Sequence, residues 1–326
     1  MRVLITGGCG FVGRHFTKRF LDDGASVTIV DDLSASRAVS FWPSFLCPLV
    51  AQQKQLTQHY EDVRNWFRRS TSVASDYDLI IHCAAVVGGR LTIDGDPLKV
   101  ATDLSIDAGF FNWVVRGKPS KVIYFSSSAV YPVELQTQRM HVQLGEGIVR
   151  IGNRIAMPDQ TYGWAKLSGE VLAGHARESY GLDVAVYRPF SGYGEDQDSS
   201  YPMPAICARA VRRENPMTIW GSGEQQRDFI HIDDVVDAVL ATYELLPSRM
   251  PLNLGTGHPT SFNELARIAL EMVGHEAPIV NDPGKPEGVF SRVADPYAML
   301  RLYQPKITLG EGVARVCDYL NSILRK

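Results

Sequence analysis

Three glycines near the start of the chain, Gly7, Gly10 and Gly13, constrain the fold more than any other feature of the sequence. A β-rich run over residues 1–6 leads into them, and apolar residues then return at helical spacing in residues 11–21. This order predicts a strand, a tight turn and a helix. We expect Gly7 to turn the chain at positive φ, Gly10 to leave room for a pyrophosphate, and Gly13 to let the helix lie close to the strand.

A second predicted strand, residues 26–30, ends in Asp31 and Asp32. A carboxylate at this point is placed to accept hydrogen bonds from the hydroxyls of an adenosine ribose, and it would repel a 2′-phosphate. The sequence therefore favours NAD over NADP, although Arg37 nearby keeps NADP as an alternative and a solvated turn is the plainer role for the two aspartates. The helix N-terminus, which begins with Phe11 and Val12, would face the phosphates of the cofactor.

The composition is that of an ordinary globular chain, with 326 residues, 45% hydrophobic and 21% charged. A net charge of −3 gives no reason to expect nucleic acid or an acidic membrane as a partner. Because the first residues lead directly into a predicted strand and no apolar run is long enough to span a bilayer, we expect a cytoplasmic protein. The five cysteines and eight histidines form no metal-ligand spacing, so we expect free thiols and no bound metal.

Small residues follow the next predicted buried strand, residues 78–82. Ala84, Ala85 and the pair Gly88 and Gly89 would let a flat ligand pass close to the backbone at the end of this strand. Before it, a short strand is expected to precede Asp62, with a helix over residues 63–69; after it, helical periodicity covers residues 97–115 and another strand covers residues 121–126. Alternating strands and helices of this kind predict a doubly wound parallel α/β sheet.

Two polar groups of residues follow in the second half of this pattern. Three serines, Ser126, Ser127 and Ser128, end the predicted strand, where ligands bind in such sheets, although a polar strand end would look the same. Tyr162 and Lys166 are four residues apart in a predicted helix and therefore share one face. An ammonium beside a phenol lowers the tyrosine pKa from about 10 towards neutrality, so that the tyrosine can take a proton from an alcohol. Taken alone, such a pair is more often surface packing.

In this order, the glycines, Asp31, the serines and the Tyr–Lys helix resemble the extended short-chain dehydrogenase/reductases, in their nucleotide-sugar epimerase and dehydratase group. The likeness continues through residues 187–194, 219–234, 252–257 and 292–295 and so covers nearly the whole chain. It implies an NAD-binding Rossmann domain over residues 1–189, which exchanges a strand and helix with a smaller mixed α/β domain over residues 190–326 that binds a nucleotide-diphosphate sugar. It also implies a homodimer formed through a helix bundle.

The resemblance implies a role for each matching residue. Ser127 would hydrogen-bond the sugar hydroxyl, Tyr162 would be the acid and base, and Lys166 would bind the nicotinamide ribose. The remaining cofactor contacts would be Asp62, Val63, Ala84 and Ala85, with Asp62 at the adenine. The substrate contacts would be Gly88, Ser128, Ser191, Arg227 and Arg292, the two arginines being aimed at the pyrophosphate unless they form ordinary surface ion pairs.

Departures from the family pattern reduce the number of reactions that this chain is expected to catalyse. The 4,6-dehydratases carry Asp and Glu just after the catalytic hydroxyl, where this chain has Ser128 and Ala129. Gly88 and Gly89 resemble GDP-mannose 3,5-epimerases and GDP-fucose synthases, but those carry Cys at the position of Ala129 and a later Lys or His, and residues 189–208 contain no Lys, Arg or His.

Ser127, Tyr162 and Lys166, together with NAD, suffice for a nucleotide-sugar 4-epimerase that works through a transient 4-keto sugar. The alternatives are a 3,5-epimerase, a dehydratase or a 4-keto reductase or dehydrogenase that acts on a GDP-, CDP- or UDP-sugar, and, more remotely, a non-catalytic NAD-binding protein. Asp103 and Ser191 both stand where the family usually has Asn. Residues 133–160 form a longer insertion than usual, which includes Arg150 and Arg154; it is either a loop or lid near the sugar or an inert surface excursion.

Overall fold

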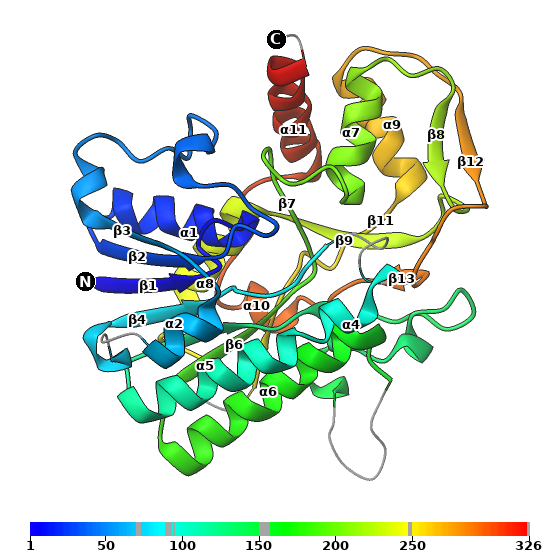
Figure 1. The fold of residues 1–326 in the computed structure, drawn as a ribbon. Coiled ribbons are helices and arrows are strands. Elements are labelled where there is room, and N and C mark those ends of the chain that lie inside the picture. Colours follow the sequence, from blue (N-terminus) through cyan, green and yellow to red (C-terminus); the bar gives the residue numbers. More distant parts are fainter. Residues whose placement is uncertain (70–72, 89–92, 94, 150–156, 247–249, 325–326) are drawn as a thin grey trace.

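The computed structural model describes residues 1–69, 73–88, 93, 95–149, 157–246 and 250–324. They form a large region, built around a parallel sheet with helices on both faces, and a smaller region at the upper right of Figure 1.

The large sheet has seven strands in the order β10-β6-β5-β4-β1-β2-β3. All its neighbouring pairs are parallel, which confirms the predicted doubly wound α/β fold. The order of the chain reverses between β1 and β4, and ligands of such sheets bind in the crevice outside the strand ends at this point. The strands are β1 (Arg2–Thr6), β2 (Ser26–Asp31), β3 (Leu56–Tyr60), β4 (Leu79–His82), β5 (Val122–Phe125), β6 (Val184–Pro189) and β10 (Leu252–Leu254).

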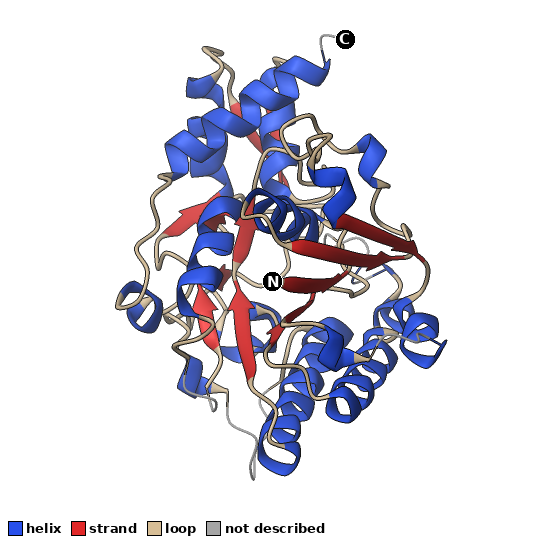
Figure 2. Ribbon diagram, turned by 90° about the vertical axis from the view of Figure 1, so that its left-hand side faces the viewer, coloured by secondary structure: helices blue, strands red, loops and turns tan. Residues whose placement is uncertain are grey.

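Helices cover the sheet on both faces (Figures 1 and 2), which is why its central strands are largely apolar, with Thr6 of β1 and His82 of β4 as buried polar exceptions. On one face, α1 (Phe11–Asp22) packs beside α8 (Ile232–Thr242), and Phe16 and Val235 share one core cluster. On the other face, α2 (Val63–Arg69), α5 (Asp103–Gly117) and α6 (Gln160–Tyr180) lie side by side, with Trp66 and Phe110 in a second cluster.

The smaller region contains a four-stranded sheet, a strand pair and three helices with a core of their own. The sheet is formed by β7 (Ser191–Tyr193), β9 (Gln226–His231), β11 (Pro259–Ser261) and β13 (Ser291–Arg292). The pair is β8 (Met217–Trp220) with β12 (Ile279–Asp282), and the helices are α7 (Pro202–Val211), α9 (Phe262–Met272) and α11 (Leu309–Leu324). Because α8 and β10 return to the large sheet, the chain passes between the regions more than once, and the division at residues 189 and 190 is kept as a proposal.

The helix predicted over residues 97–115 is divided into α4 (Pro97–Val100) and α5. Residues 101–102 separate the two helices, and an aspartate stands at the beginning of each. The Asp96 side chain caps α4 by accepting a hydrogen bond from Lys99 N at 3.0 Å, and Asp103, the first residue of α5, accepts one from Val86 N at 2.6 Å. A short helix, α10 (Tyr297–Leu300), precedes α11. Among the described helices, none is both long and apolar enough to cross a membrane.

Candidate active site

The glycine turn after β1 brings three chain segments together more closely than side chains would permit. Gly7 has a φ of 68°, and a Cβ added to it would lie 2.7 Å from Ala84 N. A Cβ on Gly13 would lie 2.1 Å from Gly7 O, so α1 rests on the turn only because this residue has no side chain. The turn and the close packing predicted for Gly7 and Gly13 are therefore confirmed. Gly10 is the N-cap of α1, in a position suited to a phosphate, and its contact with the cofactor stays a prediction.

Asp31 is buried beside this turn and organises it. Its Oδ2 accepts a hydrogen bond from Cys9 N at 3.0 Å, and its Oδ1 accepts bonds from Leu33 N at 2.9 Å and Ser36 Oγ at 2.7 Å. A carboxylate has about four acceptor positions, so one remains for a ribose hydroxyl. Asp32 is exposed and accepts a bond from Ser34 N within its own loop. The glycine turn and Asp31 together fit a dinucleotide without a 2′-phosphate.

The other predicted cofactor residues lie at the same edge of the sheet, after β3 and β4. Asp62 accepts a hydrogen bond from Arg64 N at 2.8 Å and pairs with the Arg64 guanidinium, which holds the pKa of this carboxyl below its usual value. Val63 points into the core, so only its backbone is available to a ligand. Ala84 is buried against the glycine turn, and Ala85 is partly buried next to it.

Ser127 and Tyr162 meet where the turn after β5 contacts the start of α6. The Ser127 hydroxyl accepts a bond from Ala129 N at 3.1 Å and also interacts with the Tyr162 phenol. Asp159, the N-cap residue of α6, donates its backbone N–H to Ala129 O at 2.8 Å, which fixes the helix to this turn. Lys166 follows one helical turn later, buried, with its ammonium 5.5 Å from the ring centre of Tyr124.

The pKa of Tyr162 is raised in the structure, whereas the sequence predicted that Lys166 would lower it towards neutrality. Burial raises the pKa of Tyr162 above its ordinary value, while Lys166 and the bond to Ser127 lower it, and Asp103 and Asp107 raise it further. The prediction that Lys166 brings the tyrosine pKa towards neutrality is therefore wrong for the protein chain by itself, because burial and two carboxyl groups of α5 outweigh the lysine. Burial also opposes the charge on Lys166, but Asp107, Tyr162 and Asp103 hold its pKa above the usual value.

Behind Lys166 lies a buried polar network that sequence reasoning missed. Asp107 accepts a hydrogen bond from the Tyr124 hydroxyl at 2.5 Å and lies 3.2 Å from Nε2 of His82. The other ring nitrogen of His82 is 2.6 Å from the Thr6 hydroxyl. This network connects β1, β4, β5 and α5 beneath α6. Its only sequence signal is a polar residue, Asp107, on the apolar face of a predicted helix.

Arg227 and Arg292, predicted separately to bind the substrate, are register partners on the parallel strands β9 and β13. Partners in a parallel pair lie on the same face of the sheet, so the two side chains leave the sheet side by side. Arg292 donates from Nε to Gln136 Oε1 and from Nη2 to Asp159 Oδ2, each at 2.7 Å. Arg227 donates to the carbonyls of Gln226 and Val289. Gln136 and Asp159 are a second pair of residues that sequence reasoning missed, although Asp159 lies only three residues before Tyr162.

The described part of the insertion packs against the substrate side. Leu144 donates its backbone N–H to Val293 O at 2.9 Å, and the Glu146 side chain accepts a bond from Asn253 N at 3.0 Å. This part is therefore not an inert surface excursion, and its action as a lid stays a prediction. Gly88, Ser128 and Ser191 lie in the segments that follow β4, β5 and β6, with Ser128 the most buried. Gly89, Arg150 and Arg154 lie outside the described residues.

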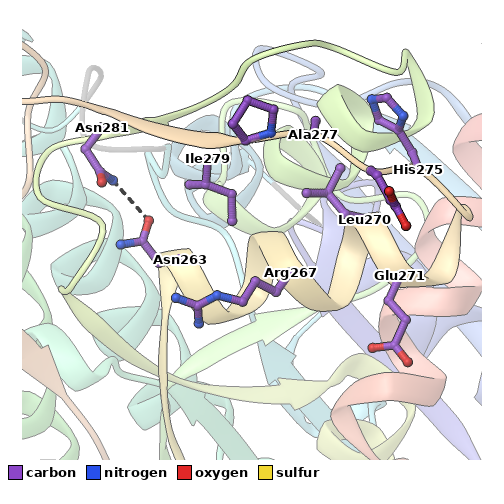
Figure 3. A pocket seen from close by; sticks show the side chains of 10 residues that line it. Asn263, Arg267, Leu270, Glu271, His275, Ala277, Ile279 and Asn281 are labelled. Atoms are coloured by element: carbon purple, nitrogen blue, oxygen red, sulfur yellow. Dashed lines mark hydrogen bonds between the residues drawn. The ribbon is translucent and has the colours of Figure 1, made fainter.

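The open groove in Figure 3 lies elsewhere, between α9 and β12 of the smaller region. Asn263, Arg267 and His275 line it, with a hydrogen bond from Asn281 to Asn263 at 3.0 Å along one side. None of the predicted site residues lines this groove. Within the ranges that the structure describes, no group of three His, Cys, Asp or Glu side chains is arranged to hold a metal ion.

Comparison with known proteins agrees with this arrangement. The model of the NAD dependent epimerase/dehydratase family matches residues 3–255. The dTDP-4-dehydro-6-deoxy-D-allose reductase of Streptomyces bikiniensis is 30% identical over 90% of this chain and 87% of its own length. The UDP-glucose 4-epimerase of Mycolicibacterium smegmatis is 26% identical over 99% of each chain. The solved UDP-glucose 4-epimerase of Thermotoga maritima, with UDP-glucose, has a TM-score of 0.83 and 26% identity over 99% of this chain and 100% of that one.

Proposed function

Because the chain belongs to the NAD dependent epimerase/dehydratase family, we propose that it is a nucleotide-diphosphate-sugar 4-epimerase acting through a transient 4-keto sugar. One observation carries this choice: Ser127 and Tyr162 meet over Lys166, while the two positions after Ser127 carry only a hydroxyl and a methyl group. A dehydratase or 3,5-epimerase needs a further acid and base beside the sugar ring, which Ser128 and Ala129 do not supply. Similarity to UDP-glucose 4-epimerases over the full length supports the proposal.

The cofactor is NAD, and the site fits it. When bound, NAD supplies an acceptor that takes a hydride from C4 of the sugar and later returns it. The chain contributes the turn at Gly7, Gly10 and Gly13 for the pyrophosphate and Asp31 for the adenosine ribose. Lys166 would donate to the nicotinamide ribose.

Tyr162 would move the proton of the 4-hydroxyl. Ser127 forms a hydrogen bond with the phenol of Tyr162, so a sugar hydroxyl that also bonds to Ser127 would be held against the phenol. Deprotonation of Tyr162 in a buried site requires a nearby positive charge, which Lys166 provides. After the 4-keto sugar has turned over, the same tyrosine would return the proton to the other face.

The substrate's diphosphate would lie between Arg227 and Arg292, the two neighbouring residues of β9 and β13. Guanidinium groups bind phosphate oxygens in pairs, which suits two arginines on one face of a sheet. For Arg292 this requires that the diphosphate replace or share its present partners, Gln136 and Asp159.

A 4-keto reductase is the second candidate, favoured by the 30% identity to a dTDP-4-dehydro-6-deoxy-D-allose reductase. A net reduction consumes a reduced cofactor in every turnover, whereas an epimerase regenerates its NAD. A homodimer and a cytoplasmic location remain proposals that rest on the family resemblance, and light scattering would measure the oligomeric state.

The test is mass spectrometry of the products formed from UDP-, GDP-, CDP- and dTDP-sugars with NAD in deuterated water. A 4-epimerase returns the substrate's own hydrogen, so we expect an epimer without carbon-bound deuterium. Deuterium at C3 or C5, loss of water, or stoichiometric use of reduced cofactor would reject the proposal. Tyr162→Phe should lower kcat about 1,000-fold while NAD binding persists, because only the proton-transfer group is removed; retained turnover would reject the role of Tyr162.

A further inference from the structure

Asp103 is a buried carboxyl group with an incomplete set of hydrogen bonds. Its side chain is 0% exposed at the start of α5. Oδ1 accepts a hydrogen bond from Val86 N at 2.6 Å, whereas among the described residues no donor lies within hydrogen-bonding distance of Oδ2. Buried polar atoms are nearly always paired, so an orphaned carboxylate oxygen needs an explanation.

The groups that surround Asp103 belong to the candidate active site. Lys166 and Tyr162 face it from α6, Asp107 from its own helix, and Tyr124 from β5. Cys83, at the end of β4, also acts on Lys166, but burial raises the pKa of its thiol to about 12, so it is uncharged near neutral pH. Lys166 is therefore the positive charge, and Asp107 the second carboxyl group, in this buried cluster.

The contact with Val86 does not require a carboxylate, because an amide oxygen accepts the same hydrogen bond. A carboxylate adds negative charge next to Tyr162 and Lys166, the pair that would carry the reaction. Asp107 already has two partners, His82 and Tyr124, that compensate its charge. Asp103 has one backbone N–H, and Tyr162 experiences its charge more strongly than that of Asp107, whereas Lys166 responds more strongly to Asp107.

We propose that Asp103 is a positioning residue whose negative charge, together with that of Asp107, offsets the charge of Lys166 and so helps to set the pH at which Tyr162 loses its proton. The proposal rests on the proposed function only in taking Tyr162 as the proton-transfer group. Asp103 raises the pKa of Tyr162 where Lys166 lowers it, in agreement with this role. Burial raises the pKa of Asp103 itself to about 6, so its charge is present at neutral pH and is lost in mild acid.

The experiment is a titration of the NAD-bound enzyme followed by tyrosinate absorbance near 295 nm, which needs no substrate. Subtracting the curve of Tyr162→Phe from that of the wild type isolates Tyr162. The same subtraction, between Asp103→Asn with and without Tyr162→Phe, gives the midpoint in the absence of the Asp103 charge. We expect this midpoint to fall by about one pH unit, which is about ten times more phenolate at any pH below both midpoints.

Asp96→Asn is the matched control, because Asp96 is an exposed carboxylate that caps the preceding helix. It should leave the Tyr162 midpoint unchanged. Asp103→Ser removes the same charge with a smaller side chain, and we expect the same direction if Asp103→Asn folds poorly. An unchanged or higher midpoint in both Asp103 variants, or an equal shift in Asp96→Asn, would overturn the proposal.

The acid limb of the kcat profile should move in the same direction as the titration midpoint. If the titration shifts while no sugar nucleotide is epimerised, the proposed function fails and the role of Asp103 stands. If epimerisation is found and the Tyr162 midpoint does not shift, the proposed function stands and the role of Asp103 is rejected.

Discussion

The cofactor region and the substrate region of this protein prepare for their ligands in different ways. At the cofactor end of the sheet, Gly7 and Gly13 remove atoms, so that turn, helix and strand end pack against one another. In the region proposed to bind the substrate, Arg292 already donates hydrogen bonds to Gln136 and Asp159.

The two regions differ in how they compensate the loss of water around charged groups. The glycine turn has no charged side chain of its own and offers backbone N–H groups to an anion, so nothing has to be displaced. An arginine that is largely buried needs a partner, and in this structure Asp159 is the carboxylate paired with Arg292. Under the proposed function, the cofactor would add to a free turn, whereas the diphosphate would have to exchange with Asp159 at Arg292.

Gly13→Ala is expected to break the cofactor region most severely. Its methyl group would lie 2.1 Å from Gly7 O, so helix α1 must move away from the turn. We expect a loss of about 3 kcal/mol or more in the free energy of unfolding and no measurable NAD binding by calorimetry. Gly174→Ala is the control, because a Cβ on Gly174 of α6 meets no atom within 4 Å; it should leave NAD binding intact. Normal NAD affinity in Gly13→Ala would show that the close packing is not required.

Asp103→Asn tests the buried charges beside Lys166, which lie in the large region. The pKa of Asp103 is raised to about 6 in the folded chain from 3.8, so the folded state binds more protons between pH 4 and 6, and stability falls as the pH rises through that window. Removal of the carboxyl should therefore stabilise the protein by up to about 3 kcal/mol at pH 7 and by little at pH 4. Urea unfolding at both pH values measures this, and an equal effect at both would contradict it.

Arg292→Ala addresses the substrate region alone. Loss of the charge-assisted hydrogen bonds that Arg292 would make to the diphosphate should raise KM for the nucleotide sugar about 30-fold, while NAD affinity is unchanged. Because Asp159 would be left buried without its arginine, Arg292→Ala should also be less stable, and adding Asp159→Asn should restore part of that loss. A KM within twofold of the wild type would mean that the diphosphate does not reach β13.

Asp159→Asn is expected to change KM the least of these variants. It distinguishes a carboxylate that competes with the diphosphate from one that orients Arg292. If binding is an exchange, removing the charge that competes with the diphosphate should lower KM about threefold, although the variant is less stable. Affinity for a nucleoside diphosphate, measured by calorimetry, should improve by the same factor. Weaker binding would instead assign Asp159 to holding Arg292 in a productive orientation.

The turn and close packing at the glycines could be predicted from the sequence because the residues involved are neighbours along the chain. Gly7, Gly13 and Asp31 lie within 25 residues, and each role follows from a steric or charge requirement that no other residue type meets. The doubly wound parallel sheet, the helix over residues 63–69 and a helix carrying Tyr162 and Lys166 were also predicted from local patterns. The division between α4 and α5 was not predicted; α5 begins at Asp103, whose side chain accepts a hydrogen bond from Val86 N, 17 residues earlier in the chain.

The substrate region was predicted only as a set of residues. That Arg227 and Arg292 are neighbours follows from the register of two short strands, and the pairing of Arg292 with Asp159 joins residues 133 positions apart. The pKa of Tyr162 was misjudged because its burial and the carboxyl groups of α5 belong to the tertiary structure and not to the Tyr–Lys spacing.

The return of α8 and β10 to the large sheet limits how this protein can be dissected. A fragment ending at Pro189 would lack the edge strand beside β6 and would leave Phe16 without the α8 side of its core. Such a fragment would expose an open sheet edge and an apolar face, both of which favour aggregation. Any chimaera that exchanges substrate specificity between relatives must therefore keep residues 232–254 with the cofactor half, and cut the chain at three points instead of one.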